Sequence, residues 1–145
     1  MYRTVYLLVF FCLIFSISFS QNKDEMAVRN LLAEQTKEWN HGNVRGFMSG
    51  YWKSDSLLFI GKSGLTHGWQ KTLDNYQKHY PDTAAMGKLQ FELLEVKHLS
   101  VMYFFVIGKW HLARSAGDLE GVFTLLFRKI HSKWVIIADH SSSNE

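Results

Sequence analysis

The sequence predicts an α+β fold in which three N-terminal helices pack on one face of a curved antiparallel sheet. Apolar residues recur at helical spacing in the first half of the chain, and from residue 89 onward they alternate at the period of a β-strand. Helices followed by a meander of strands are typical of α+β proteins rather than of alternating α/β folds. At 145 residues, 47% of them hydrophobic, the chain has the length and composition of one domain with a buried core.

Residues 1–20 are predicted to be a signal peptide, with residues 21–145 forming the single domain. A nearly unbroken apolar run over residues 5–19 follows Arg3 and is shorter than the roughly 20 residues that a bilayer span needs. Cleavage after Ser20 would remove Cys12, the one cysteine, and leave a thiol-free chain suited to an oxidising compartment. We therefore expect an exported protein, periplasmic or secreted, with an uncleaved N-terminal anchor as the alternative.

Three helices are expected before Pro81. The first begins with Asp24 and Glu25, at the end where the helix dipole favours negative charge. Gly42 suits the left-handed C-terminal position of this helix, and Asn43 suits the N-cap of the next one. The predicted elements of this half are helices over residues 24–39, 44–52 and 69–80, a strand over residues 57–60, and a tight loop over residues 61–64.

Four strands are predicted behind the helices, over residues 89–99, 102–113, 121–130 and 134–140. In the first, the apolar phase changes at Leu93-Leu94, which indicates a β-bulge. In the others, apolar residues occupy both faces, whereas a sheet with one wet face would alternate with polar residues. Because three helices can cover only one side, we expect the other side to meet a second copy in a homodimer. A sheet that curls enough to bury both sides by itself is the alternative.

The composition excludes several classes of function. The formal charge is +3 and the mean hydropathy is -0.10, and the basic residues are scattered singly apart from Arg128-Lys129. The footprint of a nucleic-acid binder is therefore missing. The single cysteine lies in the predicted signal peptide, which excludes a disulfide scaffold and thiol catalysis in the domain. The seven histidines show no metal-ligand spacing and no dinucleotide fingerprint occurs, so neither a metal nor a cofactor is predicted.

Several segments resemble the nuclear transport factor 2-like (NTF2-like) family. Residues 39–43, Trp-Asn-His-Gly-Asn, followed by Phe47-Met48, look like the joint between the first two helices of that family. Gly108-Lys109-Trp110, residues 121–124 and residues 134–142 look like the last three strands of its SnoaL-like and calcium/calmodulin-kinase-association-like branches. Over residues 24–142, the resemblance implies a cone-shaped α+β fold, commonly dimeric, with a cavity between the helices and the concave sheet.

The resemblance does not select one function, because the family includes ketosteroid isomerase, scytalone dehydratase, polyketide cyclases and many proteins without known activity. Aligned through residues 39–47, the tyrosine donor of the isomerase falls at Gln35, its catalytic aspartate near Ile60 and its protonated aspartate near Leu125. None of these three positions carries the residue type that the isomerase uses. Steroid isomerase activity is therefore not supported.

His140 is the strongest candidate for chemistry. By strand alternation it shares a face with Trp134, Ile136 and Ala138, and we assign this face to the concave side because the small Ala138 leaves room there. An imidazole titrates near pH 6.5 and can donate or accept a hydrogen bond. A histidine that only closes the strand by a hydrogen bond is the alternative. Alternation predicts that Asp139 faces the other way.

Asp55, at the entrance to the first strand, is the second candidate for acid-base work, with a turn or capping role favoured. Aromatic residues at these spacings build ordinary cores and can also line a pocket. The predicted ligand-binding residues are Tyr51, Trp52, Trp69, Tyr76, Trp110 and His140.

We therefore predict an exported homodimer that binds a small hydrophobic molecule, with no nucleic-acid partner and no membrane span after signal cleavage. Two alternatives stay open. One is an acid-base isomerase, dehydratase or cyclase that uses His140 with a tyrosine or Asp55. The other is a dimeric interaction module with a vestigial cavity.

Overall fold

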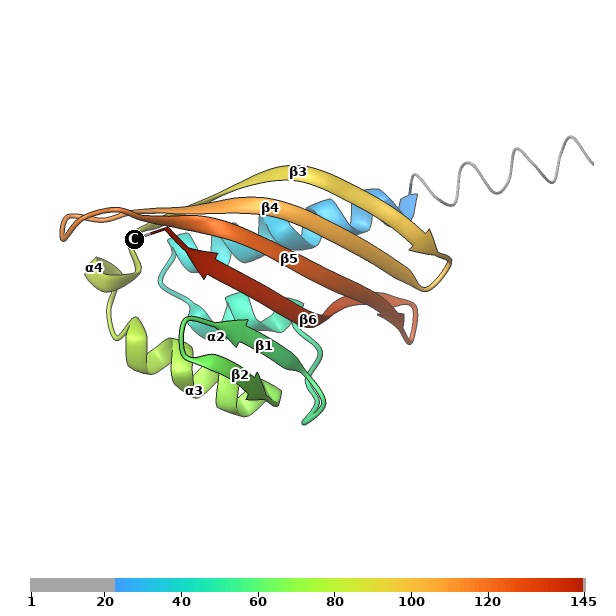
Figure 1. Cartoon of the computed structure of the whole chain (residues 1–145), viewed down its shortest axis with the longest axis horizontal. Helices are drawn as coiled ribbons and strands as arrows, with labels where there is room; N and C mark the ends of the chain where they lie inside the picture. The colour runs from blue at the N-terminus through green and yellow to red at the C-terminus, as the bar shows by residue number, and fades with distance from the viewer. Residues whose placement is uncertain (1–22, 145) are drawn as a thin grey trace, which may run out of the picture.

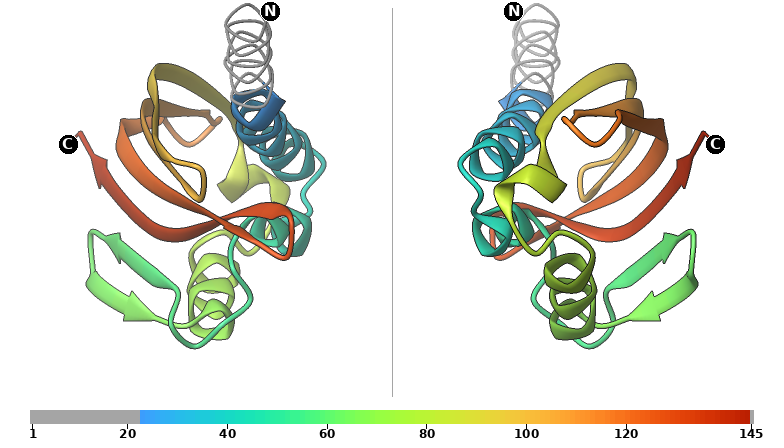
Figure 2. Two further views of the ribbon diagram at one scale, coloured as in Figure 1. Left: turned by 90° about the vertical axis from the view of Figure 1, so that its right-hand side faces the viewer. Right: turned by 90° about the vertical axis from the view of Figure 1, so that its left-hand side faces the viewer.

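The structure, a computed structural model, describes residues 23–144, so the signal peptide predicted over residues 1–20 lies outside the described residues. The helices lie on one side of a long curved sheet, and the strands form an arc that bends around them (Figures 1 and 2). The predicted α+β architecture is confirmed. Within residues 23–144, no helix has both the length and the apolar character needed to cross a bilayer.

Residues 23–40 form the N-terminal helix, which buries Val28, Leu32 and Trp39 against the sheet. The chain then turns at Gly42, whose φ of 79° lies in the left-handed region that glycine tolerates. The Asn43 side chain accepts a hydrogen bond from the N–H of Gly46 and caps the next helix. Both roles agree with the sequence prediction, because capping is decided by a few neighbouring residues.

The other helices are shorter than predicted. Helix α2 spans Val44–Phe47 and continues as one turn of 3-10 helix over Met48–Gly50, so the helical segment ends before Tyr51. Helix α3 spans Trp69–His79 and ends before Pro81, as expected. The segment predicted as a connection contains a further short helix, α4, over Thr83–Met86.

The described residues form one six-stranded sheet of order β2-β1-β6-β5-β4-β3. Neighbouring strands are antiparallel except for β1 and β6, which are parallel. The strands are β1 (Leu58–Gly61), β2 (Gly64–His67), β3 (Lys88–Ser100), β4 (Tyr103–Ala113), β5 (Leu119–Ile130) and β6 (Lys133–Ser143).

Strand β2 corrects the sequence prediction, which had no strand between the strand ending at residue 60 and the helix beginning at residue 69. It lies at the edge of the sheet and pairs only with β1, and three of its four residues are exposed. A short edge strand with no buried face carries no apolar alternation, so its sequence does not distinguish it from a loop.

Within the described residues, irregularities interrupt the strand register at three places, one of which lies between His98 and Ser100 at the end of β3. The bulge in β3, between Leu93 and Glu95, was predicted and is confirmed. A second bulge was not predicted: in β6, Ile136 pairs with Phe127 and Ala138 pairs with Leu126, which leaves Ile137 as an extra residue.

The β6 bulge overturns the predicted face of this strand. Trp134 and Ile136 do face the core, but the extra residue shifts the alternation by one position. Asp139 is consequently turned inward and buried, and His140 is exposed. The expectation that His140 shares the concave side with Ile136 is therefore wrong.

Alternation in β4 and β5 places buried residues on the concave face and half-buried apolar residues on the convex face. On the convex face, Phe105 pairs with Leu126 and Lys109 pairs with Val122, which is 46% exposed. The core between the helices and the concave face includes Leu32, Trp39, Phe47, Met48, Leu73, Phe104, Val106, Phe123, Leu125, Phe127 and Ile136.

Candidate functional site

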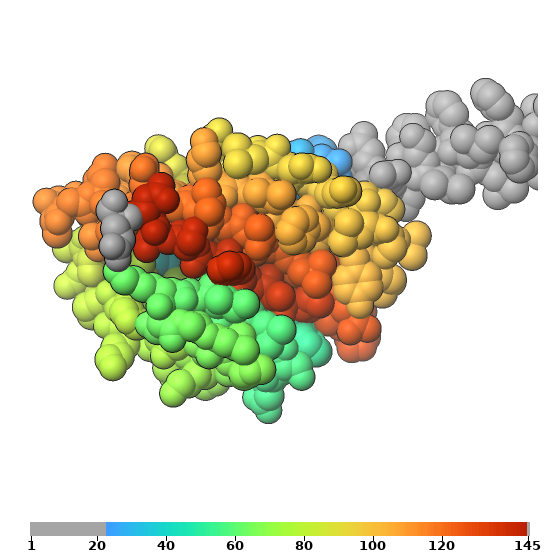
Figure 3. All heavy atoms as spheres, in the orientation of Figure 1, coloured from blue at the N-terminus to red at the C-terminus, as the bar shows by residue number. Residues whose placement is uncertain are grey.

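A cavity of about 470 Å³ lies between the N-terminal helix, α3 and the concave face of the sheet. Its mouth opens between the β1–β2 hairpin and the C-terminal end of β6, where the surface is hollowed (Figure 3). The rim is polar, with Lys62, Ser63, His79 and Asn144. This volume is in the range of sites that hold small molecules.

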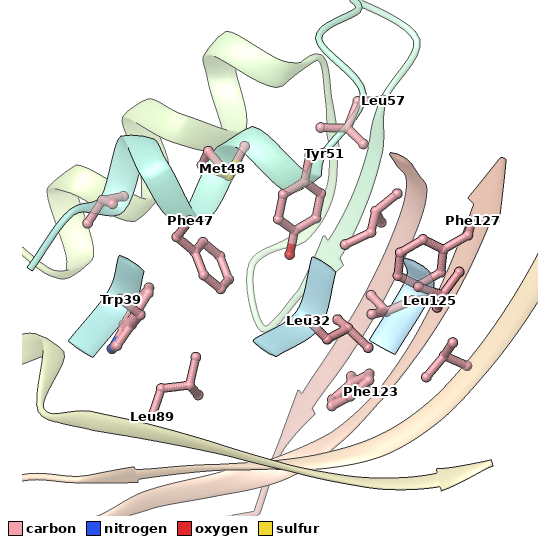
Figure 4. Close-up of a cluster of buried hydrophobic side chains, with 14 of the residues drawn as sticks. Leu32, Trp39, Phe47, Met48, Tyr51, Leu57, Leu89, Phe123, Leu125 and Phe127 are labelled. Carbon is pink, nitrogen blue, oxygen red and sulfur yellow. The ribbon is translucent and has the colours of Figure 1, made fainter. Parts of the chain in front are cut away.

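Aromatic and aliphatic side chains form the walls of the cavity. Trp39 contacts Phe47 and Tyr80 edge to face, each at 5.0 Å between ring centroids, and Tyr76 contacts Phe47 at 5.4 Å. Figure 4 shows Trp39, Phe47 and Phe123 around the same interior region, toward which the Tyr51 hydroxyl points. The apolar lining also includes Phe59, Leu89, Phe91, Trp110, Leu112, Leu119 and Leu125.

A buried, hydrogen-bonded carboxyl group stands among the apolar side chains of the lining. The Tyr51 hydroxyl donates to Oδ2 of Asp139 at 2.7 Å, and the Ser141 hydroxyl donates to Oδ1 at 2.8 Å. Asp139 is only 4% exposed. The main chain positions the pair, because Tyr51 forms a parallel bridge to Ile136 and the N–H of Trp52 donates to the Ile136 carbonyl oxygen.

Burial controls the ionisation of this site. It raises the pKa of Asp139 from 3.8 to about 6, against the opposing effects of the hydrogen bonds from Tyr51 and Ser141 and of the nearby His140. Burial and the Asp139 charge raise the pKa of Tyr51 well above its ordinary value, and the pKa of Tyr76 is raised for the same two reasons. Both tyrosines are therefore neutral donors, while Asp139 exchanges its proton near neutral pH.

Two further polar contacts shape the cavity. The buried side chain of Gln35 donates from Nε2 to the carbonyl oxygen of Phe47 at 2.9 Å, which ties the N-terminal helix to α2. The indole of Trp110 packs over Gly121 and donates from Nε1 to the carbonyl oxygen of Ser142 at 3.1 Å. A Cβ at Gly121 would contact both that carbonyl oxygen and the indole, so this position requires glycine.

The structure brings only part of the predicted site together. Tyr51, Tyr76 and Trp110 line the cavity, while Trp52, Trp69, His140 and Asp55 are not among its lining residues. The Trp69 indole is a core group that donates to the carbonyl oxygen of Met48 at 2.8 Å. Asp55 is exposed beside Gly68, at the start of α3, and His140 pairs with Ile60 and Thr124 on its neighbouring strands.

Asp139 and Ser141 are the most consequential of the lining residues that sequence reasoning missed. The signal that could have found them is the run of four apolar residues over 135–138, which breaks strand alternation just as Leu93-Leu94 does in β3. Among residues 23–144, no three His, Cys, Asp or Glu side chains gather closely enough to hold a metal ion.

Comparison with known proteins places this geometry in a family. Neither the family models nor the curated proteins searched give a match. Among solved structures, an NTF2-like protein of unknown function from Shewanella oneidensis is 41% identical, with a TM-score of 0.77. The match covers 80% of this chain and 96% of that one.

More distant structures share the fold. A ketosteroid isomerase-like protein from Erwinia carotovora atroseptica is 14% identical, with a TM-score of 0.71 over 86% of this chain and 98% of its own. LinA is also 14% identical, with a TM-score of 0.71 over 88% and 90%. The resemblance seen in the sequence is confirmed, and the chain belongs to the NTF2-like family.

Proposed function

We propose that the protein binds a small, largely apolar and uncharged molecule that carries a hydroxyl group. The observation that supports this function is the buried Asp139–Tyr51 pair in an apolar cavity of about 470 Å³. The aromatic walls favour a flat apolar body, and the pair supplies a buried polar anchor point beside them.

The expectation that the ligand carries a hydroxyl group follows from the protonation state of Asp139. With a pKa of about 6, Asp139 is mostly ionised at pH 7 and can then only accept hydrogen bonds. Tyr51 and Ser141 each occupy one of its oxygens once, which leaves lone pairs for a further donor. A ligand hydroxyl can donate there, whereas an anionic group would be repelled by the carboxylate.

Matched aromatic probes test this proposal. We expect 2-naphthol to bind at least about tenfold more tightly than 2-methoxynaphthalene at pH 7.5, because the ether cannot donate to the Asp139 carboxylate. Isothermal titration calorimetry on the protein beginning at Gln21 measures both affinities. The variant Asp139→Asn should bring the two affinities together, and Tyr51→Phe should weaken both through the disturbed anchor.

His140→Gln is the matched control, because His140 neighbours Asp139 in the chain but is exposed and outside the lining. It should leave both affinities unchanged. Equal binding of the two probes by the wild-type protein, or a preference that survives Asp139→Asn, would contradict the proposal.

A second candidate function is acid-base catalysis, favoured by the pKa of Asp139 together with the neutral Tyr51 donor beside it. An enzyme of this kind needs at least two convergent polar groups in a dry pocket, and these two residues supply them. Asp139 would take the place that the sequence hypothesis gave to His140 and Asp55.

Hydrogen–deuterium exchange at the α-carbon of 2-tetralone, followed by NMR, tests catalysis separately from binding. If Asp139 is the base, the rate should rise with pH around pH 6 and fall to the buffer rate in Asp139→Asn. A wild-type rate equal to that of the buffer would leave binding as the function.

Export and dimer formation remain part of the proposal. The apolar run over residues 5–19 supports export, and the half-buried apolar residues of the convex face support a homodimer. Intact-mass measurement of the protein recovered from its native compartment should give a chain that begins at Gln21. A retained Met1 would overturn the cleavage prediction.

A further inference from the structure

One end of the molecule carries an apolar tip far from the cavity mouth. The end of β3 exposes Leu99 by 51%, and the β3–β4 turn exposes Val101 by 75% and Met102 by 41%, so three large apolar residues are exposed within four positions. At the other end of the same strands, the β4–β5 turn has the polar sequence Arg-Ser-Ala-Gly-Asp over residues 114–118. Singly exposed apolar residues are ordinary, but a cluster at a protruding turn marks an interaction site.

The backbone of the turn does not require these residues. Tight hairpin turns favour Gly, Asn and Asp because they need positive φ angles, and the β5–β6 turn has such angles at His131 and Ser132. Neither Val101 nor Met102 has a positive φ. A hydrogen bond from the Met102 N–H to the Ser100 hydroxyl holds the turn, so polar side chains could replace Val101 and Met102 at no conformational cost.

Basic residues surround the tip. Lys97 precedes it on β3, and on β5 Arg128 pairs with Tyr103, next to Met102. The N–H of Lys129 donates to the carbonyl oxygen of Met102, which brings the Arg128-Lys129 pair directly beside the turn. Lys133 belongs to the β5–β6 hairpin at the same end of the sheet (Figure 1).

The N-terminal helix begins at this end. Asp24 accepts hydrogen bonds from Lys129 Nζ at 2.8 Å and from Trp134 Nε1 at 3.1 Å, which joins the first turn of the helix to the ends of β5 and β6. Asp24 is thereby ion-paired with Lys129, and Glu25 is ion-paired with Arg29. The first turn also exposes Met26, and Lys23 precedes Asp24.

We propose that this end, formed by the β3–β4 turn with Lys97, Arg128 and Lys133, docks on the surface of an anionic lipid bilayer. Leu99, Val101 and Met102 would enter the boundary between headgroups and acyl chains, and the cations would contact the anionic headgroups. The complementary charge and the protruding apolar tip favour a bilayer over a second copy of the chain, whose basic tip would repel this one. The cavity mouth lies elsewhere, so this proposal is independent of the proposed ligand.

Vesicle sedimentation with the protein beginning at Gln21 tests the tip without the apolar run over residues 5–19. This protein retains all the core residues, which lie within the range 28–136. We expect it to sediment with phosphatidylcholine vesicles that contain about a third phosphatidylglycerol, and to bind pure phosphatidylcholine at least about tenfold more weakly. Binding to the anionic vesicles should also fall as salt is raised.

Two variants separate the apolar and charged contributions. The double variant Leu99→Ser/Val101→Ser should reduce partitioning about tenfold or more, because the apolar side chains no longer enter the bilayer. The double variant Lys97→Gln/Arg128→Gln should reduce it about fivefold for each cation removed, on anionic vesicles only. Leu65→Ser is the matched control, because Leu65 is 55% exposed on β2, at the opposite edge of the sheet from β3.

The control should partition like the wild-type protein, and circular dichroism should show all variants folded. Failure of the wild-type protein to sediment, or equal partitioning by wild type and the Leu99→Ser/Val101→Ser variant, would overturn the proposal. Loss of a dimer in that variant, seen by sedimentation velocity, would overturn it as well, because a second copy would then cover the tip.

Discussion

Asp139 combines full burial with a titratable charge, and its environment favours the neutral form. The two hydrogen bonds from Tyr51 and Ser141 stabilise the carboxylate, but they do not outweigh the loss of hydration. A buried carboxyl group with a raised pKa destabilises the folded protein when it ionises, because the charge has lost its hydration. The rest of the fold holds the group in place. Such a residue is more useful for a ligand or a reaction than for stability.

The stability of the protein should therefore depend on the protonation of Asp139. In the unfolded chain this carboxyl loses its proton near pH 3.8, whereas in the folded protein it keeps the proton up to about pH 6. Its contribution to the free energy of unfolding is thus fully present below about pH 4 and is lost as the pH rises to about 6, by up to about 3 kcal/mol.

Urea unfolding of wild type and Asp139→Asn at pH 4 and pH 7 measures this dependence. Relative to wild type, the variant should become more stable as the pH rises, because asparagine does not ionise. Asp24 and Asp118, whose pKa values are lowered, act in the opposite direction but equally in both proteins. A difference between the two proteins that is the same at both pH values would show that burial does not raise the pKa of Asp139.

At the scale of elements, one side chain joins the end of the N-terminal helix to the start of β3. Asn40 accepts a hydrogen bond from the N–H of Leu89 at 2.7 Å and donates to the Leu89 carbonyl oxygen at 3.1 Å. The Lys88 side chain adds a bond to the Asn40 carbonyl oxygen. This contact fixes the spacing between helix and sheet beside Leu89 and Trp39, which both line the cavity.

We expect Asn40→Ala to destabilise the protein by about 2 kcal/mol, because both main-chain groups of Leu89 lose their partner. Asn30→Ala is the control, since Asn30 is exposed on the same helix and should change stability by less than about 0.5 kcal/mol. Thermal or urea unfolding of the two variants measures the difference. Equal effects of the two substitutions would show that the contact to Leu89 contributes little.

At the scale of the whole molecule, the two faces of the sheet differ in what covers them. The concave face packs against the helices, while within the described residues no helix covers the convex face, where Phe105, Ile107, Leu126 and Val122 lie. Apolar residues that remain partly exposed over neighbouring strands, here β4 and β5, are typical of a surface that meets another chain.

We predict a dimer through this face, with about twice the mass of one chain in sedimentation at micromolar concentration. Leu126→Glu should give a folded monomer, because a buried unpaired carboxylate in a two-fold interface costs several kcal/mol. Leu65→Glu, on the edge strand β2, should remain dimeric. A stable wild-type monomer would show instead that the curvature of the sheet buries this face sufficiently.

Much of the fold could be predicted from the sequence. Apart from β2 and α4, the order of helices and strands follows from apolar periodicity and turn chemistry, as do the cap at Gly42 and Asn43 and the bulge at Leu93. These signals depend on residues close together in the chain. The family resemblance rested on the same local segments and was confirmed by the 41% identical relative.

The site itself depended on tertiary structure. Tyr51 and Asp139 are 88 residues apart, and the parallel bridge between Tyr51 and Ile136 and the extra residue Ile137 decide that they meet. The apolar run over residues 135–138 is the sequence sign of this bulge, which places Asp139 instead of His140 at the cavity wall. The sequence by itself determined the elements and their family, because local periodicity encodes them. Only the tertiary structure decided which titratable side chain is buried, because strand register is set by long-range pairing.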